Sequence, residues 1–215
     1  MSVTIPKNIA QHMLIKKHLP INYDIKHITD STGPHAGQSQ TEKLRKLRQR
    51  FQMVFQDPFG SLDPRRNVGW SIAEPLRAIG EKHQLEDRVS EALLQVGLKI
   101  TDRAKFPHEF SGGQRQRIAI ARAIVTRPAL LVADEAVSAL DVSVQAQILN
   151  LLMDIQDSLG LAVLFISHDL SVVASICDKI IVMNGGAILE SGTLREVLGS
   201  PKNEYTRSLL TAAGG

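Results

Sequence analysis

Four consecutive residues, Ser111, Gly112, Gly113 and Gln114, form the strongest candidate for a phosphate-binding segment in this chain. They precede an apolar run at 118–123 in which a helix is expected. Two glycines beside a serine at the start of a helix bring free backbone N–H groups to the positive end of the helix dipole, where an anion is favoured. An ordinary N-cap would explain the serine alone, but it would not explain the glycines and the glutamine.

Acidic residues follow an apolar run at 129–133. Asp134, at the end of this expected strand, is placed to hold Mg²⁺ directly or through water. The adjacent Glu135 points elsewhere and could polarise an attacking water. His168 follows a second apolar run and is expected at the same sheet edge. Each signal is weak alone, because many strands end in acidic residues and a lone histidine there is usually a surface or capping residue.

These residues need a scaffold, and the second half of the chain supplies one. Short continuous apolar runs indicate buried strands, and apolar residues at helical spacing indicate helices that cover a sheet. A further apolar segment, Val54-Phe55, ends at Gln56. Strand–helix–strand alternation of this kind predicts an α/β fold with a mainly parallel sheet. The expected strands are 129–133, 161–167, 179–183 and 187–190, and the expected helices are 144–159 and 171–177.

The middle of the chain is different in character, because residues 72–106 are largely helical in pattern. We interpret residues 72–125 as a helical subdomain inserted between sheet segments of a domain that spans 46–215. Residues 1–45 form an atypical N-terminal segment, with a weak strand pattern at 23–28 and a loop pattern at 31–40.

The composition limits the class of protein. The chain has 215 residues, of which 43% are hydrophobic, and this is enough for one packed domain. Its net charge is only +3, and the basic run at 43–50 is more simply a solvated helix face than a nucleic-acid site, since only 4% of residues are aromatic. Cys177 is the only cysteine, so no intrachain disulfide can form. The longest apolar stretches are too short to cross a bilayer.

The order and spacing of these residues resemble the ABC ATPase family over residues 45–211. The chain carries Gln56 where that family has its Q-loop and Phe110–Gln114 where it has its signature motif. Leu130–Asp134 is similar to the Walker B strand, with Glu135 at the position of the catalytic glutamate. The D-loop and the switch histidine are matched by Ser138–Asp141 and His168. Within the family, the segments 51–65, 141–147 and 204–210 resemble dipeptide and oligopeptide importer ATPases.

The resemblance implies an ABC-type, P-loop NTPase-like fold and use of ATP and Mg²⁺. It also implies that two ATPase subunits, identical or different, sandwich the nucleotides, so that the signature residues and Asp141 contact ATP held by the partner. Gln56, Glu135 and His168 would then serve this chain's own site, with Asp134 and Gln56 at the metal. Transmembrane permease subunits would bind the surface near Gln56, with the chain peripheral on the cytoplasmic face of the membrane.

One family element is missing from the sequence. The P-loop pattern Gly-x-x-x-x-Gly-Lys-Ser/Thr occurs nowhere. The nearest segment, 33–39, is one residue too short and has Gln38 in place of the lysine, so a polar linker is the simpler interpretation. The N-terminal part is therefore expected to be truncated or rearranged, and loss of a central strand is expected to leave neighbouring strand edges unpaired.

Three functions remain open from the sequence. The chain could be an ATPase subunit of a peptide-type importer with an impaired ATP site of its own. It could be a non-catalytic partner that lends its signature motif in trans. An inactive truncated product, which has no function of its own, is a further alternative. An ATPase acting on nucleic acid is supported only by the basic run at 43–50 and is the weakest of the three.

Overall fold

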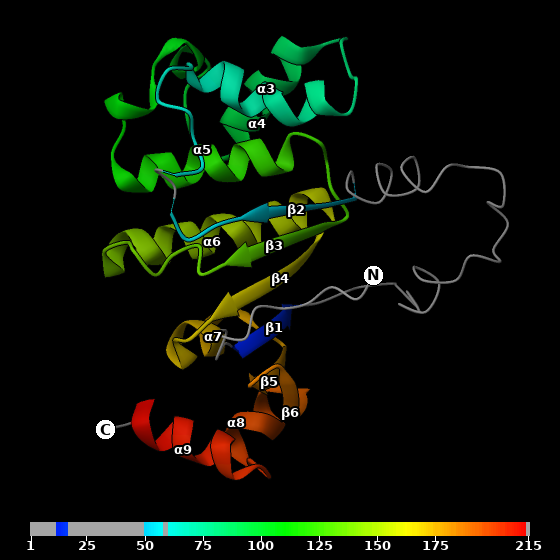
Figure 1. The fold of residues 1–215 in the computed structure, drawn as a ribbon, viewed down its shortest axis with the longest axis vertical. Coiled ribbons are helices and arrows are strands. Elements are labelled where there is room, and N and C mark those ends of the chain that lie inside the picture. The colour runs from blue at the N-terminus through cyan, green and yellow to red at the C-terminus, as the bar shows by residue number, and fades with distance from the viewer. Residues whose placement is uncertain (1–11, 17–49, 58–59, 214–215) are drawn as a thin grey trace, which may run out of the picture.

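A computed structural model describes residues 12–16, 50–57 and 60–213, which contain one six-stranded sheet (Figure 1). The strand order across the sheet is β2-β3-β4-β1-β5-β6. The parallel neighbours β2 and β3, and β3 and β4, are consecutive in the chain and are joined by crossovers that contain helices. The strands are β1 (His12–Lys16), β2 (Phe51–Val54), β3 (Leu130–Asp134), β4 (Ala162–Ser167), β5 (Lys179–Asn184) and β6 (Ala187–Thr193).

Four of the six strands run in the same direction. β2 pairs with β3 and β3 pairs with β4 in parallel. β1 is antiparallel to both β4 and β5, so β5 runs in the direction of β4, and β6 returns antiparallel to β5. This confirms the predicted α/β class with a mainly parallel sheet. The expected strands of the second half are all present, although β6 continues three residues beyond the expected range.

The position of β1 corrects one prediction. We expected neighbouring strand edges to be unpaired where a central strand is missing, but β1 lies between β4 and β5 and pairs with each of them. Its pairing, from His12 with Ser167 to Lys16 with Val163, covers all of β4 except Ala162. The strand pattern at 23–28 and the glycine-containing segment at 33–39 lie outside the described residues.

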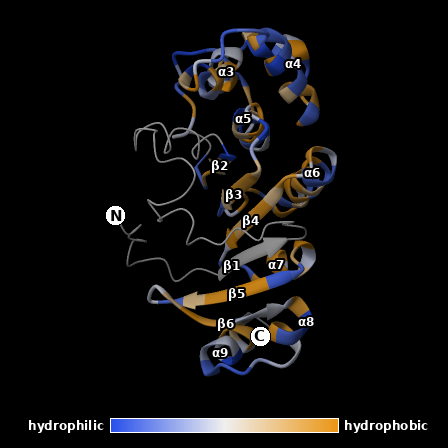
Figure 2. Cartoon of the chain, turned by 90° about the vertical axis from the view of Figure 1, so that its right-hand side faces the viewer, coloured by the Kyte–Doolittle hydropathy of each residue, from blue (hydrophilic) through white to orange (hydrophobic). Residues whose placement is uncertain are grey.

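Helices α6 (Val142–Leu159) and α7 (Leu170–Ile176) lie on the same side of the sheet (Figure 2). The sheet residues that alternate toward one face, such as Leu131, Ala133 and Phe165, are almost fully buried. α6 ends at Gly160, whose φ of +63° is the left-handed conformation that stops a helix. Two further helices, α8 (Leu194–Gly199) and α9 (Glu204–Ala213), pack beside β5, β6 and α7.

Three other helices pack on one another at the β2 end of the sheet (Figure 1). They are α3 (Val68–Ala78), α4 (Leu85–Gln95) and α5 (Gly112–Ile124), with the short 3₁₀ segments η1 (Ile100–Ala104) and η2 (Pro107–Glu109) before α5. Buried Ile72, Leu76, Leu93 and Ile120 fill the space among them. The interpretation of residues 72–125 as an inserted subdomain stays a prediction. In the described ranges, no helix is both long and apolar enough to span a bilayer.

Candidate functional site

The ends of β3 and β4 bring the acidic residues and the histidine together. Asp134 is the last residue of β3 and pairs with Ile166, one residue before the end of β4. The backbone N–H of Glu135 donates to the carbonyl oxygen of Ile166 at 3.0 Å, which extends the pairing by one step. Because the two strands are parallel, the residues that follow them emerge at the same edge, as the sequence predicted for His168.

Glu135 and His168 are in direct contact. The Nδ1 atom of His168 lies 3.0 Å from Oε1 of Glu135. The Glu135 side chain is 13% exposed and that of His168 is 62% exposed, so the carboxylate is the sheltered partner. Glu135 has φ of +47°, an unfavourable conformation for a residue with a Cβ. Backbone strain of this kind is concentrated at functional sites, where surrounding structure holds it.

Asp134 lies in an environment that disfavours its negative charge. Burial of the carboxyl group, and then the nearby charge of Glu135, raise the pKa of Asp134. A bound cation would relieve both effects. Mg²⁺ usually takes only one or two protein carboxylates and completes its shell with water and phosphate oxygens, so a single aspartate fits a metal that arrives with a nucleotide. Within the described segments, no group of three or more His, Cys, Asp or Glu side chains could hold a metal alone.

Gln56 lies at this sheet edge but does not touch the acidic pair. Val54 pairs with Ala133, so Gln56 is two residues beyond β2 just as Glu135 is two residues beyond Ala133. Gln56 is exposed, and no hydrogen bond between described residues joins it to Asp134, Glu135 or His168. Its assignment to the metal therefore stays a prediction.

Ser111 is the N-cap of α5. This is the role that an ordinary helix cap would give this serine. Its hydroxyl oxygen accepts from the N–H of Gln114 at 3.3 Å, and Oε1 of Gln114 accepts from the N–H of Ser111 at 3.0 Å. This capping box uses two first-turn donors. The N–H groups of Gly112 and Gly113 have no intrahelical acceptor at this position, and they remain available to an anion.

The structure also gives the second glycine a packing role that the sequence did not show. A Cβ atom on Gly113 would lie 2.5 Å from Cγ1 of Val144 in the first turn of α6. A Cβ atom on Gly112 would meet Cδ2 of Leu140 at 3.8 Å, which is an ordinary contact. The start of α5 therefore rests against Leu140 and Val144. Val144 does not stand out in the sequence, since it belongs to an apolar helical pattern, and Leu140 enters there only as a member of the segment Ser138–Asp141.

Asp141 lies between these two contacts. It occupies the N-cap position of α6, is exposed, and makes no side-chain capping bond. The preceding turn is held by Ser138, whose hydroxyl donates to the carbonyl oxygen of Glu135 at 3.0 Å. The segment from Glu135 to Val144 thus connects the sheet edge to the start of α5.

A groove separates β2 from the helices above it. It has a volume of about 390 Å³, and its lining includes Phe51, Met53 and Phe55 together with Pro75 and Arg122. The three apolar β2-side residues are 42%, 38% and 52% exposed, respectively, which is unusual for side chains of this size.

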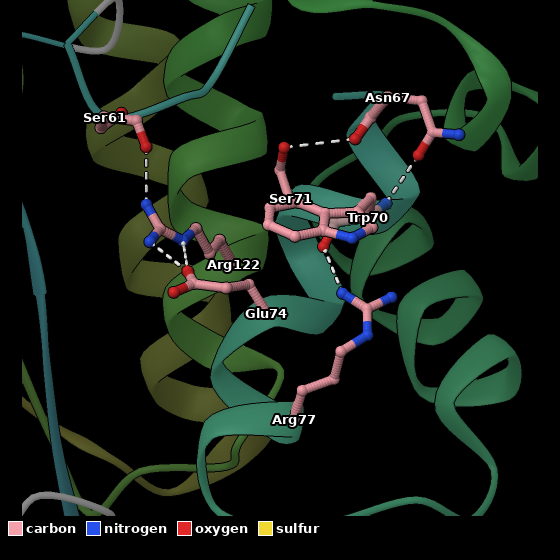
Figure 3. Close-up of polar contacts among 7 residues, drawn as sticks. All are labelled: Ser61, Asn67, Trp70, Ser71, Glu74, Arg77 and Arg122. Atoms are coloured by element: carbon pink, nitrogen blue, oxygen red, sulfur yellow. Dashed lines mark hydrogen bonds and ion pairs between the residues drawn. The ribbon is translucent and has the colours of Figure 1, made fainter. Parts of the chain in front are cut away.

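A polar contact fixes the helical wall of this groove (Figure 3). The guanidinium of Arg122, on α5, donates a hydrogen bond of 2.6 Å to the carbonyl oxygen of Ser61. It also forms an ion pair with Glu74 on α3. One arginine therefore joins α5, α3 and the segment that follows β2.

Comparison with known proteins gives the same assignment as the motifs. The dipeptide transport ATP-binding protein DppF of Escherichia coli (strain K12) is 50% identical over 175 residues, covering 80% of this chain and 52% of that protein. The oligopeptide transport ATP-binding protein OppD of Mycobacterium tuberculosis is 54% identical over 173 residues, and the glutathione import ATP-binding protein GsiA of Salmonella typhimurium is 52% identical over 172 residues. These alignments cover 80% and 79% of this chain but only 28% of each relative. The chain therefore spans from about a quarter to a half of the relatives' length.

A solved structure supports the fold. CbiO1 from Clostridium perfringens, part of the ABC transporter complex CbiONQ, matches with a TM-score of 0.66 and 31% identity over 75% of this chain and 64% of that one. The ABC transporter family model matches residues 20–138, which is more than half of the sequence. The ordered motifs, the sheet that aligns them and these matches agree, and the chain belongs to the ABC transporter ATPase family.

Proposed function

We propose that this chain is an ATP-binding component of an importer for peptides or peptide-like solutes, and that its own ATP site is defective. The observation that carries the proposal is the contact between Glu135 and His168 beside Asp134, at the end of two parallel strands. The names of the relatives, which describe dipeptide, oligopeptide and glutathione transport, support the solute class.

The direction of β1 supports the defect. β1 is antiparallel to β4, so its last residue, Lys16, pairs with Val163 at the edge of the sheet away from Asp134. A phosphate-binding loop that follows a strand and serves Asp134 would have to start at the opposite edge. The sequence contains no P-loop pattern at all, so no lysine of that motif would neutralise the phosphates of a nucleotide in this chain.

The residues that are present would act on a nucleotide through three groups. Bound Mg²⁺ would supply charge neutralisation at the phosphate oxygens. The Asp134 carboxylate would hold the ion, and the Glu135 carboxylate would orient and deprotonate a water. The His168 imidazole would hold Glu135 in place through the 3.0 Å contact.

A second candidate function follows from the intact start of α5. The exposed Ser111 and the free N–H groups of Gly112 and Gly113 could bind the γ-phosphate of ATP held by a partner subunit, identical or different. This chain would then activate its partner without binding ATP in its own site. Asp141, exposed beside this segment, would lie in the same contact.

The groove beside β2 is the proposed contact with transmembrane permease subunits, which would place the chain at the inner face of the membrane. Its exposed Phe51, Met53 and Phe55 provide apolar area that a partner could bury. Gln56 directly follows this surface, so movement there could reach the sheet edge.

The first experiment measures Mg-ATP binding to the purified chain by calorimetry, using Glu135→Gln to prevent turnover. We expect no binding at micromolar nucleotide by a chain whose circular dichroism shows it to be folded. Micromolar binding that is lost in Asp134→Asn would show a complete site and contradict the defect.

The second experiment tests the role in trans. The chain is mixed with an ABC ATPase that retains its P-loop but has its own signature serine replaced by arginine. We expect turnover to rise with added chain, and Ser111→Arg to remove the gain. Ser200→Arg, an exposed serine after α8, is the control for the added charge. Equal stimulation by both variants would rule out a role for the start of α5.

A further inference from the structure

The side chain of Gln116 is fully buried in α5 and has no hydrogen-bond partner among the described residues. Its exposed fraction is 0%, and neither Nε2 nor Oε1 is bonded. The residues at 118–121 of the same helix are all apolar and buried. A buried amide without a partner destabilises a fold, because it loses its hydrogen bonds to water and gains none in exchange. The stability of this arrangement therefore does not account for a glutamine at this position.

Gln116 lies on the side of α5 that packs on α6. It follows Gly113 by three residues, so the two are neighbours on the helix surface, and a Cβ on Gly113 would lie 2.5 Å from Cγ1 of Val144 in α6. Side chains in a helix point back toward its N-terminus, which directs the Gln116 amide toward the turn that contains Gly112 and Gly113. The unpaired amide and the backbone N–H groups that are available to an anion therefore share one turn of α5.

The polar contacts near the start of α6 are also weak. Nε2 of Gln145 lies 3.5 Å from the carbonyl oxygen of Val137, which is the outer limit of a hydrogen bond. Asp141, the N-cap of α6, makes no side-chain capping bond. Where α5 meets the start of α6, Gln116, Asp141 and Gln145 are thus poorly bonded to the described part of the chain.

The polar contacts of α5 with its other neighbours are short. Three arginines of α5 donate hydrogen bonds of 2.6–2.7 Å to backbone carbonyl oxygens outside the helix. Arg115 and Arg117 bond to η2 and to the residue after α4, and Arg122 bonds to the segment after β2 and pairs with α3 (Figure 3). A small shift of α5 against α6 therefore breaks fewer strong contacts than a shift of α5 against α3, α4 or η2, and packed helices can slide in such steps.

We infer that Gln116 is a positioning residue, whose unpaired amide favours a second arrangement of α5 on α6 that binds phosphate at the start of α5. In that arrangement the amide is hydrogen-bonded, and the N–H groups of Gly112 and Gly113 contact the anion. The unpaired amide raises the free energy of the unbound chain only, so it strengthens phosphate binding. Gln116 itself contacts no phosphate. The inference rests on the second candidate function only in taking the phosphate from ATP that a partner subunit holds.

Gln116→Met tests the inference, because methionine has a similar volume and no amide. The variant is mixed with the ABC ATPase that retains its P-loop and has its own signature serine replaced by arginine. We expect the chain concentration that gives half-maximal stimulation to rise roughly 5- to 150-fold, the range of a typical coupling between sites. The urea midpoint of the variant alone should rise as well. These two results separate a positioning role from a merely structural one, because damage to the fold would lower both stability and stimulation.

Thr126→Val is the matched control. Oγ1 of Thr126 is also buried without a described partner, so this change removes a second unsatisfied group, at the opposite end of α5 from Gly113. It should raise the urea midpoint and leave the concentration for half-maximal stimulation unchanged. If Gln116→Met disturbs folding, Gln116→Leu provides a second variant without the amide, and the same two results are expected.

A measurement without the partner separates this inference from the role in trans. Tripolyphosphate, which has the phosphates of ATP but no ribose or base, is titrated into the chain alone. The NMR signals of the Gly112 and Gly113 N–H groups and of the Gln116 side-chain amide are followed. We expect them to shift with one dissociation constant, which Gln116→Met should raise roughly 5- to 150-fold and Thr126→Val should not change.

Four outcomes would overturn the inference. They are an unchanged dissociation constant in Gln116→Met, equal effects of Gln116→Met and Thr126→Val, glycine signals that shift while the Gln116 amide signal does not, and no binding of tripolyphosphate by the unmodified chain. Failure of the unmodified chain to stimulate the partner, with the tripolyphosphate results as expected, would contradict the role in trans and leave this inference standing. Full stimulation by Gln116→Met at the unmodified chain's concentrations would contradict this inference and leave the role in trans standing.

Discussion

Replacing Gly113 by alanine should destabilise the protein, whereas the same change at Gly112 should not. An alanine Cβ at Gly113 would lie 2.5 Å from Cγ1 of Val144, while carbon atoms in contact normally lie about 3.5–4.0 Å apart. Val144 cannot easily turn away, because a β-branched side chain in a helix has one strongly preferred rotamer. The start of α5 must therefore move away from α6 by about 1 Å.

The expected magnitude comes from two opposing effects. Overpacking costs about 1–3 kcal/mol, and alanine in a helix gains up to about 1 kcal/mol over glycine, less in the first turn. We expect Gly113→Ala to lower the free energy of unfolding by about 1–2 kcal/mol. Gly112→Ala, whose Cβ would meet Leu140 at 3.8 Å, should be neutral or slightly stabilising.

Urea unfolding followed by far-UV circular dichroism measures both variants. The cause is tested by adding Val144→Ala, which removes the obstructing methyl group. In the double variant, Gly113→Ala should cost at least about 1 kcal/mol less than it does alone. Equal stability of the two glycine variants, or additive effects of Gly113→Ala and Val144→Ala, would refute the packing explanation and leave phosphate binding as the reason for both glycines.

Three further changes have predicted signs. The raised pKa of Asp134 means that the folded chain holds the proton of this carboxyl group more tightly than the unfolded chain does, so the stability of the fold decreases as the pH rises from the ordinary pKa through the raised pKa. Asp134→Asn should therefore increase the free energy of unfolding at neutral pH, measured by urea titration. The gain should disappear below about pH 4. Gln116 is fully buried with neither amide atom hydrogen-bonded to a described residue, so Gln116→Met should raise the unfolding free energy by about 1 kcal/mol; a loss would mean that the amide is paired in solution. Arg122→Met should lower the free energy of unfolding by about 1 kcal/mol, because it removes the polar contact between α3 and α5. If its thermal midpoint equals that of Glu74→Gln, the hydrogen bond from Arg122 to Ser61 adds nothing to stability.

Much of the sheet could be predicted because its apolar runs are long and end in polar residues. One apolar run ends at Asp134 and another ends just before His168, so each predicts a strand and the position of its last residue. Parallel neighbouring strands end at the same edge of a sheet, so the residues that follow them lie close together. The contact between Glu135 and His168 follows from that geometry, although its 3.0 Å distance does not. The left-handed backbone of Glu135 had no sequence signal, since glycine or asparagine is the usual residue there.

Contacts between distant segments could not be predicted in the same way. Val144 supports Gly113 from a helix that begins about thirty residues later, and Arg122 joins three segments through one guanidinium. In both cases the sequence shows an ordinary helical residue, because the information lies in how two helices approach each other. Such contacts depend on side-chain size at the crossing point, which periodicity alone does not determine.

The direction of β1 has the largest consequence for function. A five-residue segment with three apolar residues at its centre can pair in either direction with its neighbours, so its residue types do not select one. Pairing antiparallel to β4 satisfies the hydrogen bonds of both neighbouring edges, which a missing strand would have left open. It also places Lys16, not His12, at the edge remote from Asp134. The sheet is thus completed by a strand that ends at the edge away from the acidic residues, and this is why we propose that the fold can form in this chain without a competent ATP site.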